Sequence, residues 1–353
     1  MKQSRINSKK IDTEKTASPV LVTVTRGGHL ESFHRGSIVI ANARGNIIDA
    51  LGNPNFPTFM RSCAKPIQAL PIVESGATET FSFTDAELAL FCGSLNGQDF
   101  QIDILQSILT KIGLNENNLK CGIHRPSHRA TAESMRKDGL TTTQLHNNCA
   151  GKHTCMLALC VHHKYPIDTY LEVNHPVQKM ILNTVAKMCD IEAQEVKIGI
   201  DGCGVPVFSV PLKNIAVSYA KLAAPEASNE TTQRKEAIKR LTQSLVQYPE
   251  MIAGDERICT DIMRIAHGRV LAKTGADGSY AMGLLEKGLG VGIKVDDGST
   301  RALNPIVIDS LVKMGIITES EKDSLKAYYN PVISNYRKEE VGRISTTFSL
   351  KHV

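Results

Sequence analysis

The sequence has no tryptophan, few aromatic residues and no long apolar run. Aromatic residues make up 5% of its 353 residues, too few for the aromatic platforms on which single-stranded nucleic acids stack. No stretch approaches the roughly 18 consecutive apolar residues of a membrane span. A P-loop and a G-x-G-x-x-G motif after a strand are also missing. These absences argue against nucleic-acid binding, membrane insertion and nucleotide binding.

The composition is that of an ordinary soluble globular protein. Apolar residues make up 42% and charged residues 22%, and 41 basic against 36 acidic residues leave a diffuse net charge of +5. Residues 1–18 are polar and lysine-rich, which predicts a flexible tail before a single domain of two packed lobes at 19–353. This tail lacks the apolar core of a secretory signal, so we expect a cytoplasmic protein. The nine cysteines are then expected to be mostly buried thiols.

Strand-like patterns lie near both ends of the chain, and helical patterns fill the middle. The expected strands are 20–24, 37–41, 46–50, 197–200, 270–273, 280–285 and 290–295. The expected helices are one from residue 62 and those at 84–93, 98–112, 151–163, 175–188, 231–248 and 305–329. This order predicts an α/β fold of the α+β type, with an antiparallel sheet from both termini packed against a helical region.

Three short motifs point to nucleophilic catalysis. Ser62 and Lys65 form S-x-x-K, Ser94 opens S-x-N, and Lys273 opens K-T-G. This order is typical of serine β-lactamases and penicillin-binding proteins. Three further S-x-x-K tetrads are interpreted as solvated helix faces: Ser134/Lys137, Ser218/Lys221 and Ser310/Lys313.

The chemistry of these motifs requires a neutral lysine. An ammonium with a pKa near ~10.4 is not a base at pH 7, but burial and a second nearby cation lower that pKa. Lys65 and Lys273 in one cleft would provide both effects. Ser62/Lys65 and Ser94/Lys273 are therefore predicted as two Ser–Lys pairs that share proton transfer.

A second constellation surrounds two cysteines. Cys149, Lys152 and Cys203 offer two thiolates and an amine, a donor set that suits zinc once the amine is deprotonated. Two other interpretations stay open at this point. The cysteines are two buried thiols, or polar neighbours contact a substrate, namely Asn148, His153 and Asp201.

Five segments resemble the rhizobial-type L-asparaginases of the asparaginase II family. They are Arg61–Pro71, Cys121–His124, His146–His153, Asp201–Pro206 and Lys273–Gly278. The resemblance implies a serine β-lactamase-like fold, a homodimer and hydrolysis of L-asparagine to L-aspartate and ammonia. It implies the Ser–Lys pairs Ser62/Lys65 and Ser94/Lys273, and a zinc ion held by Cys149, Lys152 and Cys203.

The sequence departs from the family pattern after the second serine. The family usually has Ser-His-x-Gly-Glu, whereas Leu95 and Gln98 stand at the His and Glu positions here. In the leading hypothesis Ser62 attacks asparagine, and Arg61, His153 and Asp201 hold its α-carboxylate and α-amine. The alternatives are a β-lactamase or DD-peptidase-like acylase, a glutaminase, and a non-catalytic metal- or amino-acid-binding protein.

Overall fold

The structure is a computed structural model that describes residues 18–329 and 332–350. The tail predicted at 1–18 lies outside the described residues except for Ser18. That residue is 3% exposed, and its hydroxyl donates to Asp296 Oδ1 at 3.2 Å. Ser18 is therefore packed against the loop that follows β9.

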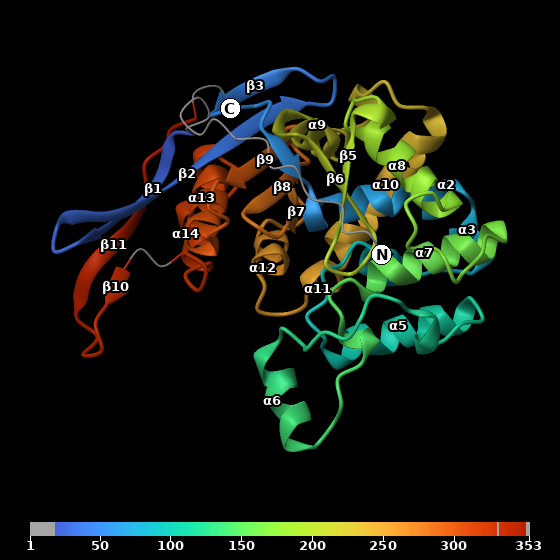
Figure 1. Cartoon of the computed structure of the whole chain (residues 1–353). Coiled ribbons are helices and arrows are strands. Elements are labelled where there is room, and N and C mark those ends of the chain that lie inside the picture. The colour runs from blue at the N-terminus through green and yellow to red at the C-terminus, as the bar shows by residue number, and fades with distance from the viewer. Residues whose placement is uncertain (1–17, 330–331, 351–353) are drawn as a thin grey trace, which may run out of the picture.

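Within the described residues, the largest sheet has eight strands and combines segments from both ends of the chain (Figure 1). The strand order is β10-β11-β1-β2-β9-β8-β7, with β3 added beside β2. Each of these neighbouring strands pairs antiparallel. The strands are β1 (Val20–Arg26), β2 (His29–Asn42), β3 (Ile47–Leu51), β7 (Val270–Thr274), β8 (Ser279–Leu284), β9 (Leu289–Val295), β10 (Val332–Ser334) and β11 (Glu340–Thr346). A separate sheet of three has the order β4 (Pro57–Phe59), β6 (Pro206–Pro211), β5 (Lys197–Ile200).

Helices from the middle of the chain form a region beside the edge of the large sheet at which β7 lies (Figure 1). The longer helices are α4 (Asp85–Phe91), α5 (Asp99–Lys111), α6 (Arg129–Lys137), α7 (Ala150–His163), α8 (Pro176–Met188), α9 (Leu212–Ala223), α10 (Thr232–Gln247), α12 (Ile258–Ile265) and α13 (Thr300–Lys313). The shorter ones are α1 (Lys65–Gln68), α2 (Leu70–Glu74), α3 (Ala77–Thr80), α11 (Pro249–Ala253) and α14 (Glu319–Asp323). Five 3-10 turns accompany them within the described chain: η1 (Arg61–Ala64), η2 (Glu116–Asn118), η3 (Gln144–His146), η4 (Ala193–Glu195) and η5 (Pro225–Ala227).

The central strands of the large sheet are buried on both faces. Gly290 and Gly292 of β9 lie directly against the backbone of α9, because a Cβ at Gly290 would stand 2.0 Å from the Ala216 carbonyl oxygen. Successive side chains of a strand point to opposite faces, so Val291 and Ile293 point away from α9, and α13 packs against this strand as well. The apolar core runs through both sheets and the helical region.

Most elements expected from the sequence are present, and the antiparallel sheet from both termini packed against helices is confirmed. Thr84 and Glu87 form the expected capping box of α4. The helix expected at 305–329 is instead divided into α13 and α14 by a turn near Gly315, whose φ is +64°. Sequence patterns did not predict α6, α9, α12, β10 or β11.

The interpretation of two S-x-x-K tetrads as solvated helix faces is wrong. Ser218 and Lys221 are 0% and 3% exposed, because α9 packs between the large sheet and the helical region. Ser310 is also fully buried, on the side of α13 that faces the core. The nine cysteines are all free and buried, as expected for a protein whose thiols pack as small apolar groups.

Among the described residues, no helix combines the length and the apolar character that a membrane span requires.

We expect Gly290→Ala to destabilise the fold strongly. Its Cβ would lie 2.0 Å from Ala216 O and 2.2 Å from Ala220 N, and both are backbone atoms that cannot turn aside. Forcing α9 away from β9 should lower the free energy of unfolding by about 3 kcal/mol or more, measured by urea denaturation. Gly283→Ala on the adjacent strand is the matched control, because its nearest atom lies at 3.0 Å. Equal losses in the two variants would contradict the close approach of α9.

Candidate active site

The segment with Ser62 is held against the K-T-G strand. Ser62 lies in η1, and Pro66 follows in the first turn of α1, where its missing N–H does no harm. The Cys63 thiol donates to the Lys273 carbonyl at 3.2 Å, and the Tyr219 hydroxyl donates to the Cys63 carbonyl at 2.9 Å. The serine turn is thus tied to both β7 and α9.

Arg61, just before this serine, has a φ of +49°, a left-handed backbone that non-glycine residues adopt rarely. Strained backbone of this kind persists only where surrounding contacts impose it, and it is found most often at functional sites.

Two lysine amines from distant segments meet at one serine hydroxyl. Lys65 Nζ lies 3.1 Å and Lys273 Nζ 2.8 Å from Ser94 Oγ. Lys65 and Lys273 are 1% and 0% exposed, and Ser94 is 6% exposed. The hydroxyl has one proton, so it can donate to only one of these amines and must accept from the other.

Backbone carbonyls complete the surroundings of both amines. Lys65 Nζ also donates to the carbonyls of Gly93 at 2.7 Å and Asn148 at 3.0 Å, and Lys273 Nζ donates to that of Thr274 at 3.3 Å. These acceptors fix the position of each amine at the serine.

Ser62 is close to this cluster in sequence but is not bonded to it. Within residues 18–329 and 332–350, no hydrogen bond involves the Ser62 hydroxyl, and the residue is half-buried. The Lys65 side chain extends into the interior, toward Ser94 and the two carbonyls. The i, i+3 spacing therefore yields no Ser62–Lys65 hydrogen bond in this structure, and the role of Ser62 stays a prediction.

Burial makes both lysines weaker bases than free lysine. It lowers the pKa of Lys65, and Lys152 adds to the effect while Cys149 and Cys203 oppose it. Burial, assisted by the charge on Lys65, lowers the pKa of Lys273 to about 8. The neutral amine that the chemistry requires is therefore accessible near neutral pH.

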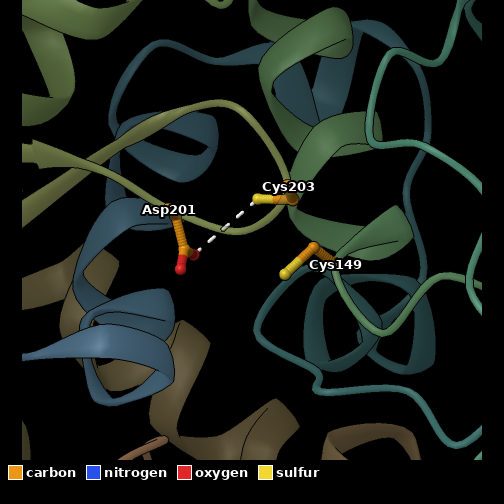
Figure 2. A group of neighbouring side chains, drawn as sticks. All are labelled: Cys149, Asp201 and Cys203. Carbon is orange, nitrogen blue, oxygen red and sulfur yellow. Dashed lines mark hydrogen bonds between the residues drawn. The ribbon is translucent and has the colours of Figure 1, made fainter.

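Cys149, Asp201 and Cys203 form a compact group whose donor atoms lie within 4.8 Å of one another (Figure 2). Cys149 precedes α7, and the other two residues lie in the turn between β5 and β6. This turn is closed by Gly204 N donating to the Asp201 carbonyl at 2.9 Å, with a φ of +91° at Gly204. Two sulfur ligands and a carboxylate are a donor set that zinc accepts.

The group is partly ionised by its neighbours. The hydrogen bond with the Cys203 thiol, together with the charges on Lys65 and Lys152, lowers the pKa of Cys149 well below its usual value. The same hydrogen bond raises the pKa of Cys203, so the two sulfur atoms share one negative charge. Lys152 Nζ lies 3.1 Å from Asp201 Oδ2, so this amine is ion-paired with the carboxylate. Sequence reasoning placed Lys152 in the metal set and Asp201 in the substrate set, and the structure brings the two into contact.

The residues predicted to bind substrate occupy different depths. Arg61 is partly exposed and forms ion pairs with Asp201, at 3.3 Å, and with Asp277. Asn148 is half-buried, and no hydrogen bond of its side chain exists within the described part of the chain. These two side chains and Asp201 lie at the edge of the lysine and thiol clusters.

His153 is fully buried and held by a tyrosine that the sequence did not single out. Lys120 N donates to the Tyr170 hydroxyl at 2.9 Å, and that hydroxyl lies 2.7 Å from His153 Nδ1. Burial, with the charges on Lys152 and Lys65, lowers the pKa of His153 well below 6.5, so the imidazole is neutral. The other ring nitrogen, Nε2, is buried without a hydrogen-bond partner among the described residues.

Two kinds of site group escaped the sequence analysis. The carbonyls of Gly93 and Asn148 have no sequence signal, because every residue has a carbonyl. Tyr170 is an isolated tyrosine far from any motif.

A model of the L-asparaginase II family matches residues 22–346, nearly the whole chain. The chain belongs to the L-asparaginase II family. This confirms the resemblance drawn from the five segments, and membership implies a hydrolase of the amidohydrolase type. No curated protein matches the sequence at a significant level.

Solved structures show more distant likenesses. The protein Mglu in its native form is 12% identical, with a TM-score of 0.38, over 80% of this chain and 65% of Mglu. A β-lactamase from Mycobacterium bovis is 11% identical, with a TM-score of 0.40, over 80% of this chain and 95% of that one. A protein from Bacteroides dorei described as a β-lactamase is 10% identical, with a TM-score of 0.42, over 84% and 95%.

We expect the buried Lys273 to lower the free energy of unfolding near neutral pH. Its pKa in the folded chain, about 8, lies below the ordinary 10.5, so the unfolded chain binds more protons between these values and stability should rise with pH there. Lys273→Met removes the buried charge. We expect a gain of roughly 1–3 kcal/mol at pH 7 and a weaker rise between pH 8 and 10 in urea unfolding.

The control for this variant is Lys221→Met. Lys221 is as deeply buried but is paired with Asp190 at 2.6 Å and Glu230 at 2.7 Å. Its removal takes from Asp190 and Glu230 a shared buried cation, leaving Glu230 with Arg234 at 3.5 Å, and should cost about 3 kcal/mol. Similar losses in both variants would show that Lys273 is stabilising.

Proposed function

We propose that this family member hydrolyses L-asparagine to L-aspartate and ammonia through a serine acyl-enzyme. The observation that supports it is the Ser94 hydroxyl held between two buried lysine amines, at 3.1 and 2.8 Å. If these lysines lay on a solvent-exposed helix face, their amines would be charged and far from one another. Their convergence supports a proton-transfer chain of the form Lys65–Ser94–Lys273.

Ser62 is the proposed nucleophile because it is the more accessible serine. It is half-buried with a free hydroxyl, whereas Ser94 is 6% exposed and bonded to both amines. In acylation the Ser62 oxygen bonds to the carboxamide carbon while its proton passes to the neutral amine of Lys65. Hydrogen bonds of this kind often tighten only when substrate is bound.

The leaving group takes up the proton that the serine loses. As the C–N bond breaks, Lys65 returns a proton through Ser94 and Lys273 to the departing nitrogen, which leaves as ammonia. Water then attacks the acyl carbon, one of the amines accepts a proton from it, and the Ser62 hydroxyl is restored as aspartate leaves.

The polar rim of the site supports an amino-acid substrate. In our proposal Arg61 binds the α-carboxylate and Asp201 and Asn148 contact the α-amine. His153, whose Nε2 has no partner among the described residues, provides a further polar contact. Arg61 and Asp201 already pair with each other at 3.3 Å, so a zwitterion would exchange one ion pair for two.

We also propose that zinc binds beside this rim. Cys149 and Cys203 would hold it as thiolates, with Asp201 or Lys152 as the third ligand. When bound, zinc supplies a positive charge that orients polar groups of the substrate. The homodimer and the cytoplasmic location remain predictions of the sequence.

Ser62→Ala and Ser94→Ala should each reduce ammonia release from asparagine by about 10² or more, since each removes a step of proton transfer or bond formation. Rapid quenching and peptide mass analysis should find the acyl group on the peptide with Ser62. Ser134→Ala is the control, because Ser134 lies in another S-x-x-K tetrad, on the exposed helix α6. An adduct on Ser94, with full activity in Ser62→Ala, would overturn the assignment.

Assays with other substrates and ligands distinguish the alternative functions. Glutamine tests a side chain longer by one methylene, a difference that a permissive pocket discriminates only weakly. Turnover of a chromogenic cephalosporin without response to asparagine would favour the acylase alternative. Stabilisation by asparagine without ammonia release would favour a binding protein.

Zinc binding is testable without turnover. We expect about one zinc per chain in the purified protein and near-complete loss in Cys149→Ala and Cys203→Ala, measured by mass spectrometry of the metal. Cys160→Ala, a buried thiol of the α7 core, is the control. Comparing Asp201→Asn with Lys152→Met identifies the third ligand. Equal zinc content in all the variants would refute the site.

A further inference from the structure

The loop that carries Ser94 connects α4 to α5 and is tied to two neighbouring segments. Ser94 N donates to the Ile252 carbonyl at 2.7 Å, and Leu95 N donates to the Asn148 carbonyl at 3.1 Å. The first bond reaches α11 and the second reaches the residue before Cys149. These bonds fix the backbone of the serine, and the side chain of Gln98 fixes the far end of the loop.

Gln98 forms a two-way contact with Asp255. Gln98 Oε1 accepts from Asp255 N at 2.8 Å and from Asn96 Nδ2 at 2.8 Å, while Gln98 Nε2 donates to Asp255 Oδ2 at 3.1 Å. An amide has an acceptor and a donor on adjacent atoms, and a carboxylate has only acceptors. The set of partners therefore specifies glutamine at this position.

The surroundings leave this contact little freedom. Asn96 is fully buried, and Gly254 adopts a φ of +84° where a Cβ would lie 2.2 Å from the Asn96 amide. Asp255 Oδ1 accepts from Arg264 Nη1 at 3.0 Å, which holds the carboxylate in place from its other side. A displaced Asp255 would lose this ion pair.

We propose that Gln98 is a positioning residue that holds the Ser94 hydroxyl between the two lysine amines through its amide contact with Asp255. The proposal rests on the proposed function, because Ser94 is taken as the proton-transfer serine. Gln98 itself touches neither amine in the described structure.

Gln98→Glu would place two carboxylates about 3 Å apart, where both cannot remain ionised without repulsion. The loop should open at this end and displace Ser94. Misplacing a reacting group by about 1 Å can reduce a rate by about 10², so we expect kcat for asparagine to fall at least about tenfold with KM changed less than about threefold.

The reversed pair provides the decisive comparison. In Gln98→Glu with Asp255→Asn, the new amide donates to the new carboxylate, and the backbone donor of residue 255 and the Asn96 amide keep their acceptor. The Oδ1 atom of the new asparagine can still accept from Arg264 Nη1, now as a hydrogen bond instead of an ion pair. We expect kcat to return to within about threefold of wild type. Gln106→Glu adds the same charge at an exposed position of α5 and should leave activity unchanged.

Amide hydrogen exchange measures local opening of the Ser94 loop and does not require catalytic turnover. Exchange over 95–98 and 254–255 should accelerate in Gln98→Glu and slow again in the double variant. Wild-type kcat in Gln98→Glu, or a double variant as impaired as the single one, would overturn the proposal. If the wild-type protein released no ammonia but the variants showed the expected exchange pattern, the proposed function would be wrong. The contact of Gln98 with Asp255 would then still be supported.

Discussion

The site depends on burying two lysine amines around one serine hydroxyl. Taking an ammonium out of water is costly, and the cost lowers the lysine pKa values until a neutral amine becomes accessible. Carbonyl groups of Gly93, Asn148 and Thr274 keep the amines bonded in either charge state. Because none of these acceptors is charged, they hold the lysines in place without restoring the pKa that a carboxylate partner would give them.

The thiol group and the lysine group, which appear as separate motifs in the sequence, form one continuous site. Asn148 accepts from Lys65 through its carbonyl, and the next residue, Cys149, lies with Cys203 and Asp201. Asp201 in turn pairs with Lys152 and Arg61, whose charges outweigh its burial and lower its pKa to about 2. The charges of the thiol group therefore act electrostatically on the lysine group.

The fold supplies the rigidity that such a site requires. Lys273 reaches Ser94 from the edge strand β7. Two strands further in, the glycines of β9 allow α9 to approach closely enough for Tyr219 to donate to the Cys63 carbonyl in the turn before Lys65. The Lys273–Ser94 and Tyr219–Cys63 contacts join residues 179 and 156 positions apart, so the packing of α9, and not the motifs alone, determines the geometry.

Periodic patterns and short motifs are local properties of the chain, and they predict most of the main elements, the antiparallel sheet from both ends and the family. Which groups meet depends on the tertiary structure: Lys65 lies at Ser94 and not at Ser62, and Asp201 lies with the two cysteines. Backbone carbonyls and an amide such as Gln98 carry no pattern of their own. Their roles come from long-range packing that brings distant partners within hydrogen-bonding distance, and local sequence does not encode that proximity.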